Sequence, residues 1–459
     1  MFRGFNRKLL CSVYSAQEAR EAILGGARII DSEDPKSALG NIKPRNIMAV
    51  SDAALDFERD LEVQLSTNIG EDQLLFRRSE TGEAIEKSPY EIAGKAAQAA
   101  IGVACSMGTR VHPSNLVKVG VDGMDVDKLQ EVLTEVVLTL QRTEQFSHCQ
   151  VMSVLFAQNL ELWNERKTND AVRRVLVELR EFYPSLKTDK LAFDLEKYAV
   201  GTLRDQNGQI MFTDQSQVSL GALIKRGVLP PGSNTTFIRV NELFPHAKFF
   251  PRLASGPRTN RAVIKAMVDA TADSGANAIM LDTSILSKVS NICLVDTSDS
   301  EMIDINRLCV RDGMVQSGIL KLDDIKFFVD YCHFRGVEAN VAGSVESYQA
   351  QQLWVLLPNL DQVSTRSAAS AVWVDPSNPR VQGSDTRQHR VIDRTLVRGL
   401  APPEHGGALS LPAALMNNPE ANGQFARLRE MISEKGKALG FPELQVNYVD
   451  SEGNVVGPH

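Results

Sequence analysis

The feature that most constrains the fold is the alternation of short apolar runs with helical patterns along the chain. Residues 9–14 form a strand-like run, and the capping-box spacing of Ser15 and Glu18 opens a helix that the glycine pair at 25–26 can end. A second apolar run follows at 27–31. Strands that alternate with helices are typical of a parallel sheet covered by its crossover helices.

The same pattern continues to residue 156 and resumes near residue 258. Further strands are expected at 63–67, 115–120, 149–156, 278–282, 339–342 and 362–365. Further helices are expected at 88–107, 125–140 and 258–274. Eight strands with intervening helices predict an α/β fold, a closed (β/α)8 TIM barrel rather than an open sheet. The glycine-rich motifs GxGxxG and GxxxxGK[ST] do not occur at a strand end, which disfavours nucleotide-binding folds.

The barrel pattern is interrupted once and is followed by a different composition. We expect the first part of the barrel, with strands one to five, at 8–158 and the second part, with strands six to eight, at 253–400. Residues 159–252 read as a large insertion after strand five, because they are charged and contain no clear βα unit. Residues 401–459 read as a C-terminal extension docked on the outside, and 286–318 as a long loop or second insertion.

Composition limits the partners and the compartment. The formal net charge is −7 and no block of Lys or Arg stands out, so neither nucleic acid nor an anionic membrane surface is an expected partner. The first apolar run is too short for a signal peptide, and no run of about 18 apolar residues could span a bilayer. The six cysteines lack metal spacing. A cytoplasmic protein with reduced thiols is expected.

Polar residues follow the apolar runs of several expected strands. In a TIM barrel, chemistry takes place at the carboxyl ends of the strands. The candidates in strand order are Asp31, Glu33, Lys118, Asp282, Gly343, Ser344, Arg366 and Ser367. The last four belong to strands seven and eight, where many barrels bind phosphate through backbone N–H groups and a cation.

Each candidate also has a structural interpretation. Asp31 and Asp282 could be helix caps, because Asp is a favoured cap residue. Lys118 could form a structural salt bridge with either of them, although a lysine inside a strand rarely faces a core without a partner. His112 precedes its strand and is assigned a structural role. The basic cluster at 387–394 is read as a paired, solvated surface, with a second phosphate contact as the alternative.

The chain resembles a known family at these residues, the (5-formylfuran-3-yl)methyl phosphate synthases of methanofuran biosynthesis. Residues 18–27 resemble the family's EAxEAIxGGA, and 29–40 its IIDxKNPxxGSLGA. Shorter matches are VKVG to IKVG, MLDT, AGS, the VRGA arginine at Arg366 and the RID element at 392–394. The resemblance covers about 8–158 and 252–398.

The resemblance implies a barrel enzyme that condenses two molecules of glyceraldehyde 3-phosphate. One family lysine forms a Schiff base, a second lysine transfers protons, and aspartates assist. The proton-transfer lysine matches Lys118, and Asp31 and Asp282 match family aspartates. The Schiff-base lysine falls on Glu33, however, and a carboxylate cannot form an imine. A further family lysine falls on Leu286, two residues before Lys288.

We therefore expect a divergent member of one-carbon cofactor biosynthesis, in the methanofuran or tetrahydromethanopterin pathway. It would act on or bind small phosphorylated aldehydes, with a lyase-type condensation if it turns over. Lys118, Asp31, Asp282 and Glu33 are the candidate catalytic residues, and Lys118 is expected as a proton donor or ion-pair partner, not as the imine former. Lys36 joins Gly343, Ser344, Arg366 and Ser367 as a candidate binding residue.

Three alternatives remain open. The chain could be a catalytically inactive paralogue that binds a pathway partner through 159–252, or an ordinary class I aldolase of other lineage. The trio Asp31, Glu33 and Asp282 could also hold Mg²⁺. Our expectation is no cofactor and no bound metal, a small phosphorylated substrate, and a homo-oligomer or a pathway partner as the possible assembly.

Overall fold

The computed structural model describes the barrel and the C-terminal extension but not every connecting segment. The described residues are 7–34, 42–57, 61–69, 76–78, 84–86, 89–107, 115–121, 126–156, 202–204, 210–213, 260–283, 292–296, 302–303, 317–372, 390–413, 419–449 and 455–458. Lys36, His112, Leu286 and Lys288 lie outside these residues.

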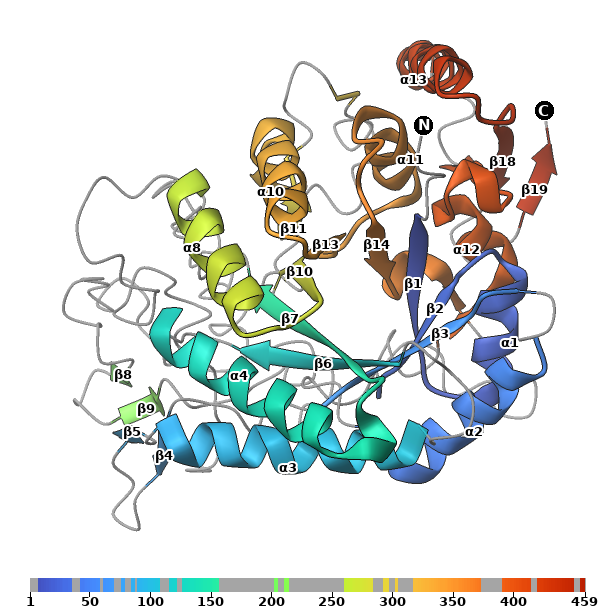
Figure 1. The fold of residues 1–459 in the computed structure, drawn as a ribbon. Coiled ribbons are helices and arrows are strands. Elements are labelled where there is room, and N and C mark those ends of the chain that lie inside the picture. Colours follow the sequence, from blue (N-terminus) through green and yellow to red (C-terminus); the bar gives the residue numbers. More distant parts are fainter. Residues whose placement is uncertain are drawn as a thin grey trace.

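Eight parallel strands form a closed barrel, which confirms the predicted TIM barrel (Figure 1). Around the barrel they follow one another in chain order, and the last strand pairs with the first. Their bounds are β1 Lys8–Val13, β2 Ile29–Ser32, β3 Gln64–Asn68, β6 Leu116–Val121, β7 Gln150–Phe156, β10 Ala278–Asp282, β13 Glu338–Val341 and β14 Gln362–Thr365. Each of the eight expected strands is found within a few residues of its predicted place.

The alternation of side chains along each strand separates two apolar layers. One set points into the barrel and forms a small interior cluster of Leu10, Ile29, Leu116, Met152, Val154, Ala278, Met280 and Ala342. The other set packs against the helices and forms the larger core. Strands buried on both faces read as continuous apolar runs, which explains why they were recognisable in the sequence.

Helices cover the outside of the barrel (Figure 1). Their bounds are α1 Ala16–Leu24, α2 Pro44–Leu55, α3 Pro89–Met107, α4 Val126–Arg142, α8 Asn260–Asp273, α10 Leu322–Phe334, α11 Ser347–Leu356 and α12 Arg394–Leu400. Ser15 caps α1 as predicted, since its hydroxyl accepts a hydrogen bond from the Glu18 N–H. Gly26 adopts a φ of +105°, and a Cβ there would lie 2.8 Å from the His405 carbonyl oxygen.

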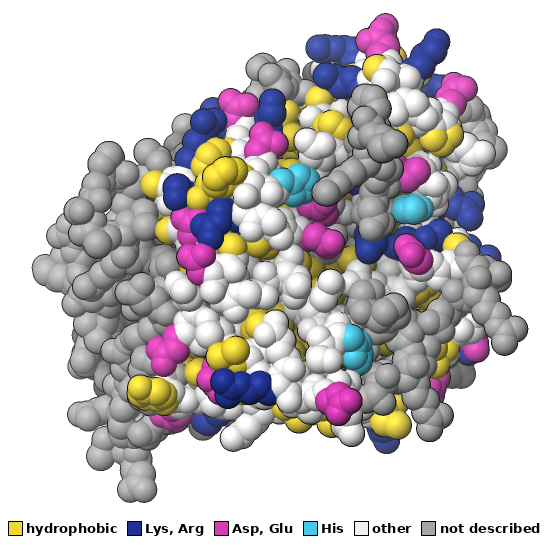
Figure 2. Space-filling model, in the orientation of Figure 1, with side chains coloured by type: hydrophobic (Ala, Val, Ile, Leu, Met, Phe, Trp, Pro, Cys, Tyr) yellow, Lys and Arg dark blue, Asp and Glu magenta, His cyan; other side chains and the backbone are white. Residues whose placement is uncertain are grey.

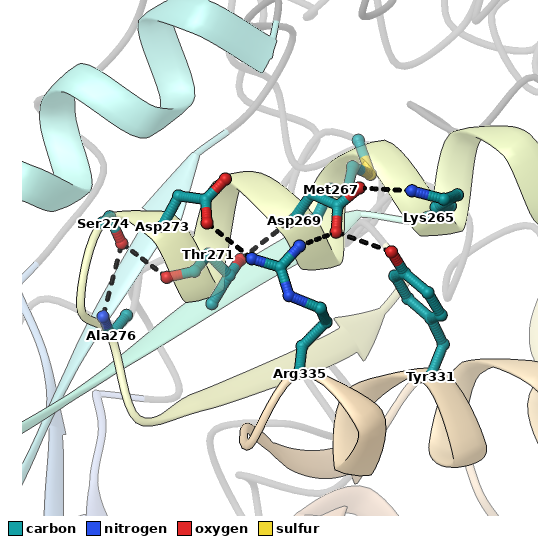
Figure 3. Close-up of polar contacts among 9 residues, drawn as sticks. All are labelled: Lys265, Met267, Asp269, Thr271, Asp273, Ser274, Ala276, Tyr331 and Arg335. Carbon is teal, nitrogen blue, oxygen red and sulfur yellow. Dashed lines mark hydrogen bonds and ion pairs between the residues drawn. The ribbon is translucent and has the colours of Figure 1, made fainter.

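A polar network joins α8 to α10 on the outside of the barrel (Figure 3). Asp269 accepts hydrogen bonds from Tyr331, at 2.7 Å, and from Arg335. Arg335 also binds Asp273 at 2.5 Å, and Lys265 binds Asp269 at 2.8 Å. In the view of Figure 2, acidic and basic side chains are interspersed over these two helices.

The segment expected as a long loop or second insertion, at 286–318, contains strands. It holds β11 Ile292–Val295 and the start of β12 Ser317–Leu320, which pair in parallel beside the barrel. Residues 370–372 and 390–392 form the antiparallel pair β15 Ser370–Val372 and β16 Arg390–Ile392. Their apolar runs are only three or four residues long, which is too short to distinguish them from a loop by pattern. Further two-stranded sheets are β4 Phe76–Arg78 with β5 Ala84–Glu86, and β8 Thr202–Arg204 with β9 Ile210–Thr213.

The C-terminal extension has a sheet and a helix of its own. Strands β17 Ala408–Pro412, β18 Gln445–Val449 and β19 Val455–Pro458 form the sheet, and α13 Pro419–Ala438 lies beside it, next to α11 (Figure 1). Their apolar side chains form a separate core with Tyr348 and Val355 of α11. We call β17–β19 and α13 the C-terminal unit.

Arg7 connects the start of β1 with α11 and with two residues of the C-terminal extension, Glu404 and Phe441. Its guanidinium donates two hydrogen bonds to the Glu404 carboxylate, at 2.7 and 2.5 Å, and one to the Trp354 carbonyl at 2.5 Å. It also lies 4.3 Å from the ring centroid of Phe441, which follows α13. With only 2% of its surface exposed, Arg7 is a buried charge with complete pairing.

Among the described residues, no helix is both long and apolar enough to cross a membrane.

Candidate active site

The centre of the site is an ion pair inside the barrel. Asp31 is on β2 and Lys118 is on β6, with β3 between them. Both side chains point inward. Asp31 and Lys118 lie two residues after Ile29 and Leu116 of the interior cluster, and residues two apart on a strand share a face. Lys118 Nζ lies 2.5 Å from Asp31 Oδ2, and the exposed fractions are 0% for Asp31 and 5% for Lys118. The salt bridge considered for Lys118 therefore forms with Asp31.

Burial and neighbouring charges have opposite effects on the pKa values of Lys118 and Asp31. Burial lowers the pKa of Lys118, but the carboxylates of Asp31 and Glu33, with a contribution from Asp282, raise it by more. The net shift is upward, so Lys118 is an ammonium at neutral pH. Burial raises the pKa of Asp31, and Lys118 offsets part of that rise. A charged lysine can donate a proton but cannot attack a carbonyl.

Two further hydroxyls approach Asp31 from the neighbouring strands. Ser12 on β1 donates a hydrogen bond of 2.9 Å to Asp31 Oδ2. Ser66 on β3 is fully buried, is paired with Asp31 in strand register, and lowers the pKa of Asp31. Sequence reasoning missed both residues. Their signal was the alternation of strands one and three, which puts each on the inward face near the carboxyl end.

Glu33 and Asp282 lie at the ends of β2 and β10 and are half-buried. The Glu33 N–H donates to the Val13 carbonyl at 2.9 Å, which extends the β1–β2 pairing by one residue. Asp282 accepts a hydrogen bond of 2.7 Å from the Thr283 N–H. Both carboxylates are near enough to Lys118 to raise its pKa. All three candidate carboxylates therefore lie near enough to Lys118 to interact with its charge.

Gly343 and Ser344 form an unusual turn after β13. Their φ angles are +89° and +61°, and Ser344 is the only non-glycine residue with a positive φ among the described residues. A Cβ at Gly343 would lie 2.9 Å from Thr283 Oγ1 and 3.0 Å from Leu294 Cβ. The position therefore requires glycine both for its dihedral angle and for its packing. Backbone N–H groups in a turn at the end of a strand can form a concave site for an anion.

Arg366 follows β14, opposite the start of α1. It donates a hydrogen bond of 2.8 Å to the Ser12 carbonyl and forms an ion pair with Glu18 at 3.4 Å. Glu18 is buried and also accepts hydrogen bonds from the backbone N–H groups of Tyr14 and Ile392. Arg366 therefore ties the last strand to the first helix. Its candidate role in phosphate binding stays a prediction, as does that of Ser367, which begins the 3₁₀ turn after it.

The basic cluster at 387–394 is described only from Arg390 onward. Asp393 caps α12 through hydrogen bonds from the Thr395 and Leu396 N–H groups. Arg394 pairs with Glu21 on the surface at 3.1 Å. These contacts of Asp393 and Arg394 agree with the structural interpretation of this part of the cluster.

In the described part of the chain, no group of three or more His, Cys, Asp or Glu side chains is arranged to hold a metal ion.

Fold and site together define a TIM-barrel protein with a charged pair at the carboxyl end of its strands, where barrel enzymes carry their active sites. Residues 9–176 match the model of one family, described as 4-HFC-P synthase. This is a family of methanofuran biosynthesis, and the match spans β1 to β7. It includes Asp31 and Lys118 and ends before Asp282.

Several solved structures are similar over most of the chain. Thiamine phosphate pyrophosphorylase from Pyrococcus furiosus has 8% identity and a TM-score of 0.32, with 86% of this chain and 96% of that chain covered. Ribulose-1,5-bisphosphate carboxylase/oxygenase from Pyrococcus horikoshii OT3 has 9% identity and a TM-score of 0.33, with 94% and 67% covered. These values support no functional comparison. No protein in a comparison with curated sequences matches this chain.

Proposed function

We propose that this protein binds small phosphorylated aldehydes, such as glyceraldehyde 3-phosphate, at the carboxyl end of its barrel, as a divergent relative of 4-HFC-P synthase in one-carbon cofactor biosynthesis. The observation that carries the proposal is the buried pair of Asp31 and Lys118, which lies within the matched residues. A buried ion pair of this kind adds little to stability, and buried titratable groups with shifted pKa values cluster at functional sites.

The phosphate and the aldehyde of the ligand would bind at different places in the site. The phosphate would bind the backbone N–H groups at Gly343, Ser344 and Ser367, with the charge of Arg366 nearby. The aldehyde end would face Asp31 and Lys118. Phosphate is an anion and suits the turn after β13, while a carbonyl and its neighbouring hydroxyl need a donor and an acceptor, which Lys118 and Asp31 supply.

Lys118 would transfer protons and would not form an imine. Its pKa is raised by the carboxylates around it, and imine formation needs the unprotonated amine. Enolisation of the aldehyde requires a base at the carbon next to the carbonyl and an acid at the carbonyl oxygen. A carboxylate of the site would act as the base and the Lys118 ammonium as the acid.

Borohydride trapping combined with calorimetry tests this proposal. The protein is titrated with glyceraldehyde 3-phosphate, then treated with borohydride and analysed by peptide mass spectrometry. We expect saturable binding and no adduct on Lys118. Binding should be lost in Lys118→Met and kept in the control Lys95→Met, since Lys95 is half-exposed on α3.

An adduct on Lys118 would overturn the assigned role, and full binding by Lys118→Met would overturn the site. An adduct on Lys36 or Lys288 would show that the imine has moved. Binding without any turnover to a furan phosphate would favour the inactive paralogue, whose specific support is the carboxylate at Glu33 in place of the family's lysine.

A further inference from the structure

Ser12 lies next to Asp31 and forms a hydrogen bond with its carboxylate. Ser12 on β1 lies opposite Asp31 on β2 in the strand register. It comes two residues after Leu10 of the interior cluster and so shares the inward face of β1. Its hydroxyl donates to Asp31 Oδ2 at 2.9 Å, and the exposed fraction of Ser12 is 6%. The hydroxyl is therefore a buried donor to a buried carboxylate, which is a stronger contact than a bond between neutral groups.

Both donors that bind Asp31 use the same oxygen. Lys118 Nζ and Ser12 Oγ each contact Oδ2, at 2.5 and 2.9 Å. Oδ1 is buried and has no hydrogen-bond partner among the described residues. Two donors on one oxygen fix the rotation of the carboxylate and leave Oδ1 as an acceptor that no described residue satisfies. The Ser66 hydroxyl, opposite Asp31 on β3, is likewise buried without a hydrogen-bond partner among the described residues, although its proximity lowers the pKa of Asp31. A buried acceptor without a partner costs free energy unless a ligand or water satisfies it.

The backbone of Ser12 is also held in place. Arg366 donates to the Ser12 carbonyl at 2.8 Å, and Glu18 holds Arg366 from the other side. Glu18 in turn accepts a hydrogen bond of 2.6 Å from the Tyr14 N–H, two residues after Ser12. The end of β1 is thus held at Ser12 by Arg366, which follows β14, and at Tyr14 by Glu18 of α1.

We propose that Ser12 is a positioning residue of the site: it holds the Asp31 carboxylate so that Oδ1 accepts a hydrogen bond from the hydroxyl next to the carbonyl of a phosphorylated aldehyde. This inference rests on the proposed function for its ligand. The contact between Ser12 and Asp31 stands on the geometry alone.

The charged groups around Asp31 determine the direction of the test. Lys118 on β6 favours the carboxylate, whereas Glu33 on the same strand opposes it, and Asp282 on β10 is close enough to act on Lys118. The Ser12 hydroxyl donates to Asp31 Oδ2, and a donor of this kind favours the ionised form of a carboxyl group. Removal of this hydroxyl should therefore raise the pKa of Asp31.

Infrared titration reads this pKa without any need for activity. The carboxylic acid band of Asp31 is identified as the band that the Asp31→Asn variant lacks. Its midpoint is then measured in wild type, Ser12→Ala, Ser12→Thr and Ser364→Ala. Ser364 is the matched control, because it is also 6% exposed and inward on β14 but donates to the Asn340 side chain at 2.7 Å.

We expect the midpoint to rise in Ser12→Ala, to return in Ser12→Thr and to stay unchanged in Ser364→Ala. In parallel, the affinity for glyceraldehyde 3-phosphate should fall by about tenfold in Ser12→Ala, while the affinity for inorganic phosphate stays the same. Loss of both affinities together would indicate a general disturbance and would contradict a positioning role.

Equal midpoints in wild type and Ser12→Ala would overturn the proposal, as would an equal rise in Ser364→Ala. If wild type binds no glyceraldehyde 3-phosphate while Ser12→Ala still shifts the midpoint, the proposed function and the ligand assigned here both fail. The positioning of Asp31 by Ser12 is supported in that case. The infrared and binding measurements therefore separate the two failures.

Discussion

At the scale of single residues, the decisive feature is that Asp31 and Lys118 depend on each other. Each is a charge removed from water, and the two form an ion pair of 2.5 Å inside the barrel. The attraction between them offsets the cost of burial only while both are present. The pair therefore makes a specific prediction for double variants.

Lys118→Met should lower the free energy of unfolding by about 3 kcal/mol, because it leaves the Asp31 carboxylate buried without its ion partner. The double variant Asp31→Asn with Lys118→Met should recover more than half of that loss, since no buried charge remains unpaired. Urea unfolding of the two single variants and the double variant measures the coupling. Additive losses would contradict the dependence of the two residues on each other.

The pH dependence of stability follows from the raised pKa of Lys118. A lysine whose folded pKa lies above its unfolded value stabilises the fold fully below the unfolded pKa, and this contribution is lost as pH rises through the folded pKa. The difference in unfolding free energy between wild type and Lys118→Met should therefore be constant from about pH 7 to 9 and shrink above about pH 10.4. A difference that shrinks already near pH 8 would mean that the lysine is neutral in the folded site.

Gly343→Ala should destabilise the protein by about 2–3 kcal/mol, because it adds both an unfavourable φ and a contact with Thr283. Gly406→Ala is the matched control. Gly406 has a φ of +79°, but a Cβ there meets nothing within 4 Å, so about 1 kcal/mol is expected. Thermal unfolding of both variants separates strain from steric overlap. Equal losses would show that packing around Thr283 yields easily.

At the scale of helices and strands, much of this structure could be predicted from the sequence. The barrel strands are buried on both faces, so each appears as an apolar run, and Asp31 and Lys118 stand out as charges within or after such runs. Ser12 could not be singled out, because a serine at a strand end is common. The contact of Arg366 with Glu18 joins residues 348 positions apart, and one sequence contains no signal for that pairing.

Arg7 joins elements that are far apart in the sequence, through its contacts with Trp354 and Glu404. Arg7→Met should lower the free energy of unfolding by about 3 kcal/mol, because the Glu404 carboxylate and the Trp354 carbonyl lose their donor in a buried place. Arg20→Met removes an exposed pair with Asp56 and should cost less than about 1 kcal/mol. Denaturant unfolding compares them. Similar losses would mean that burial of the Arg7 pair contributes nothing.

At the scale of the whole molecule, the barrel and the C-terminal unit share a core. Tyr348 and Val355 of α11 pack against apolar residues of β17, α13 and β18, so the outer face of α11 is covered by the C-terminal unit. A barrel without this unit would expose an apolar surface that soluble monomers rarely carry. The unit is therefore expected to be required for a well-behaved barrel.

A chain that ends at residue 400 should bind the dye ANS and melt at least about 5 °C below the full chain, because it uncovers α11 and removes the partner of Arg7. A chain that ends at residue 449 lacks only β19 and the residues around it, and it should melt close to the full chain. Dye fluorescence and calorimetry provide the comparison. Normal melting of the shorter chain would show that the barrel is complete without the extension.

The contacts of Arg7 can form only late in translation, because its partners are far along the chain. Arg7 leaves the ribosome 397 residues before Glu404, which at about 5–20 residues per second is a delay of about 20–80 s. Closure of β1 onto β14 waits almost as long, since Leu9 pairs with Val363. The first strand can pair with β2 early in synthesis, but its other edge stays open until β14 has been made, and only then can the barrel close.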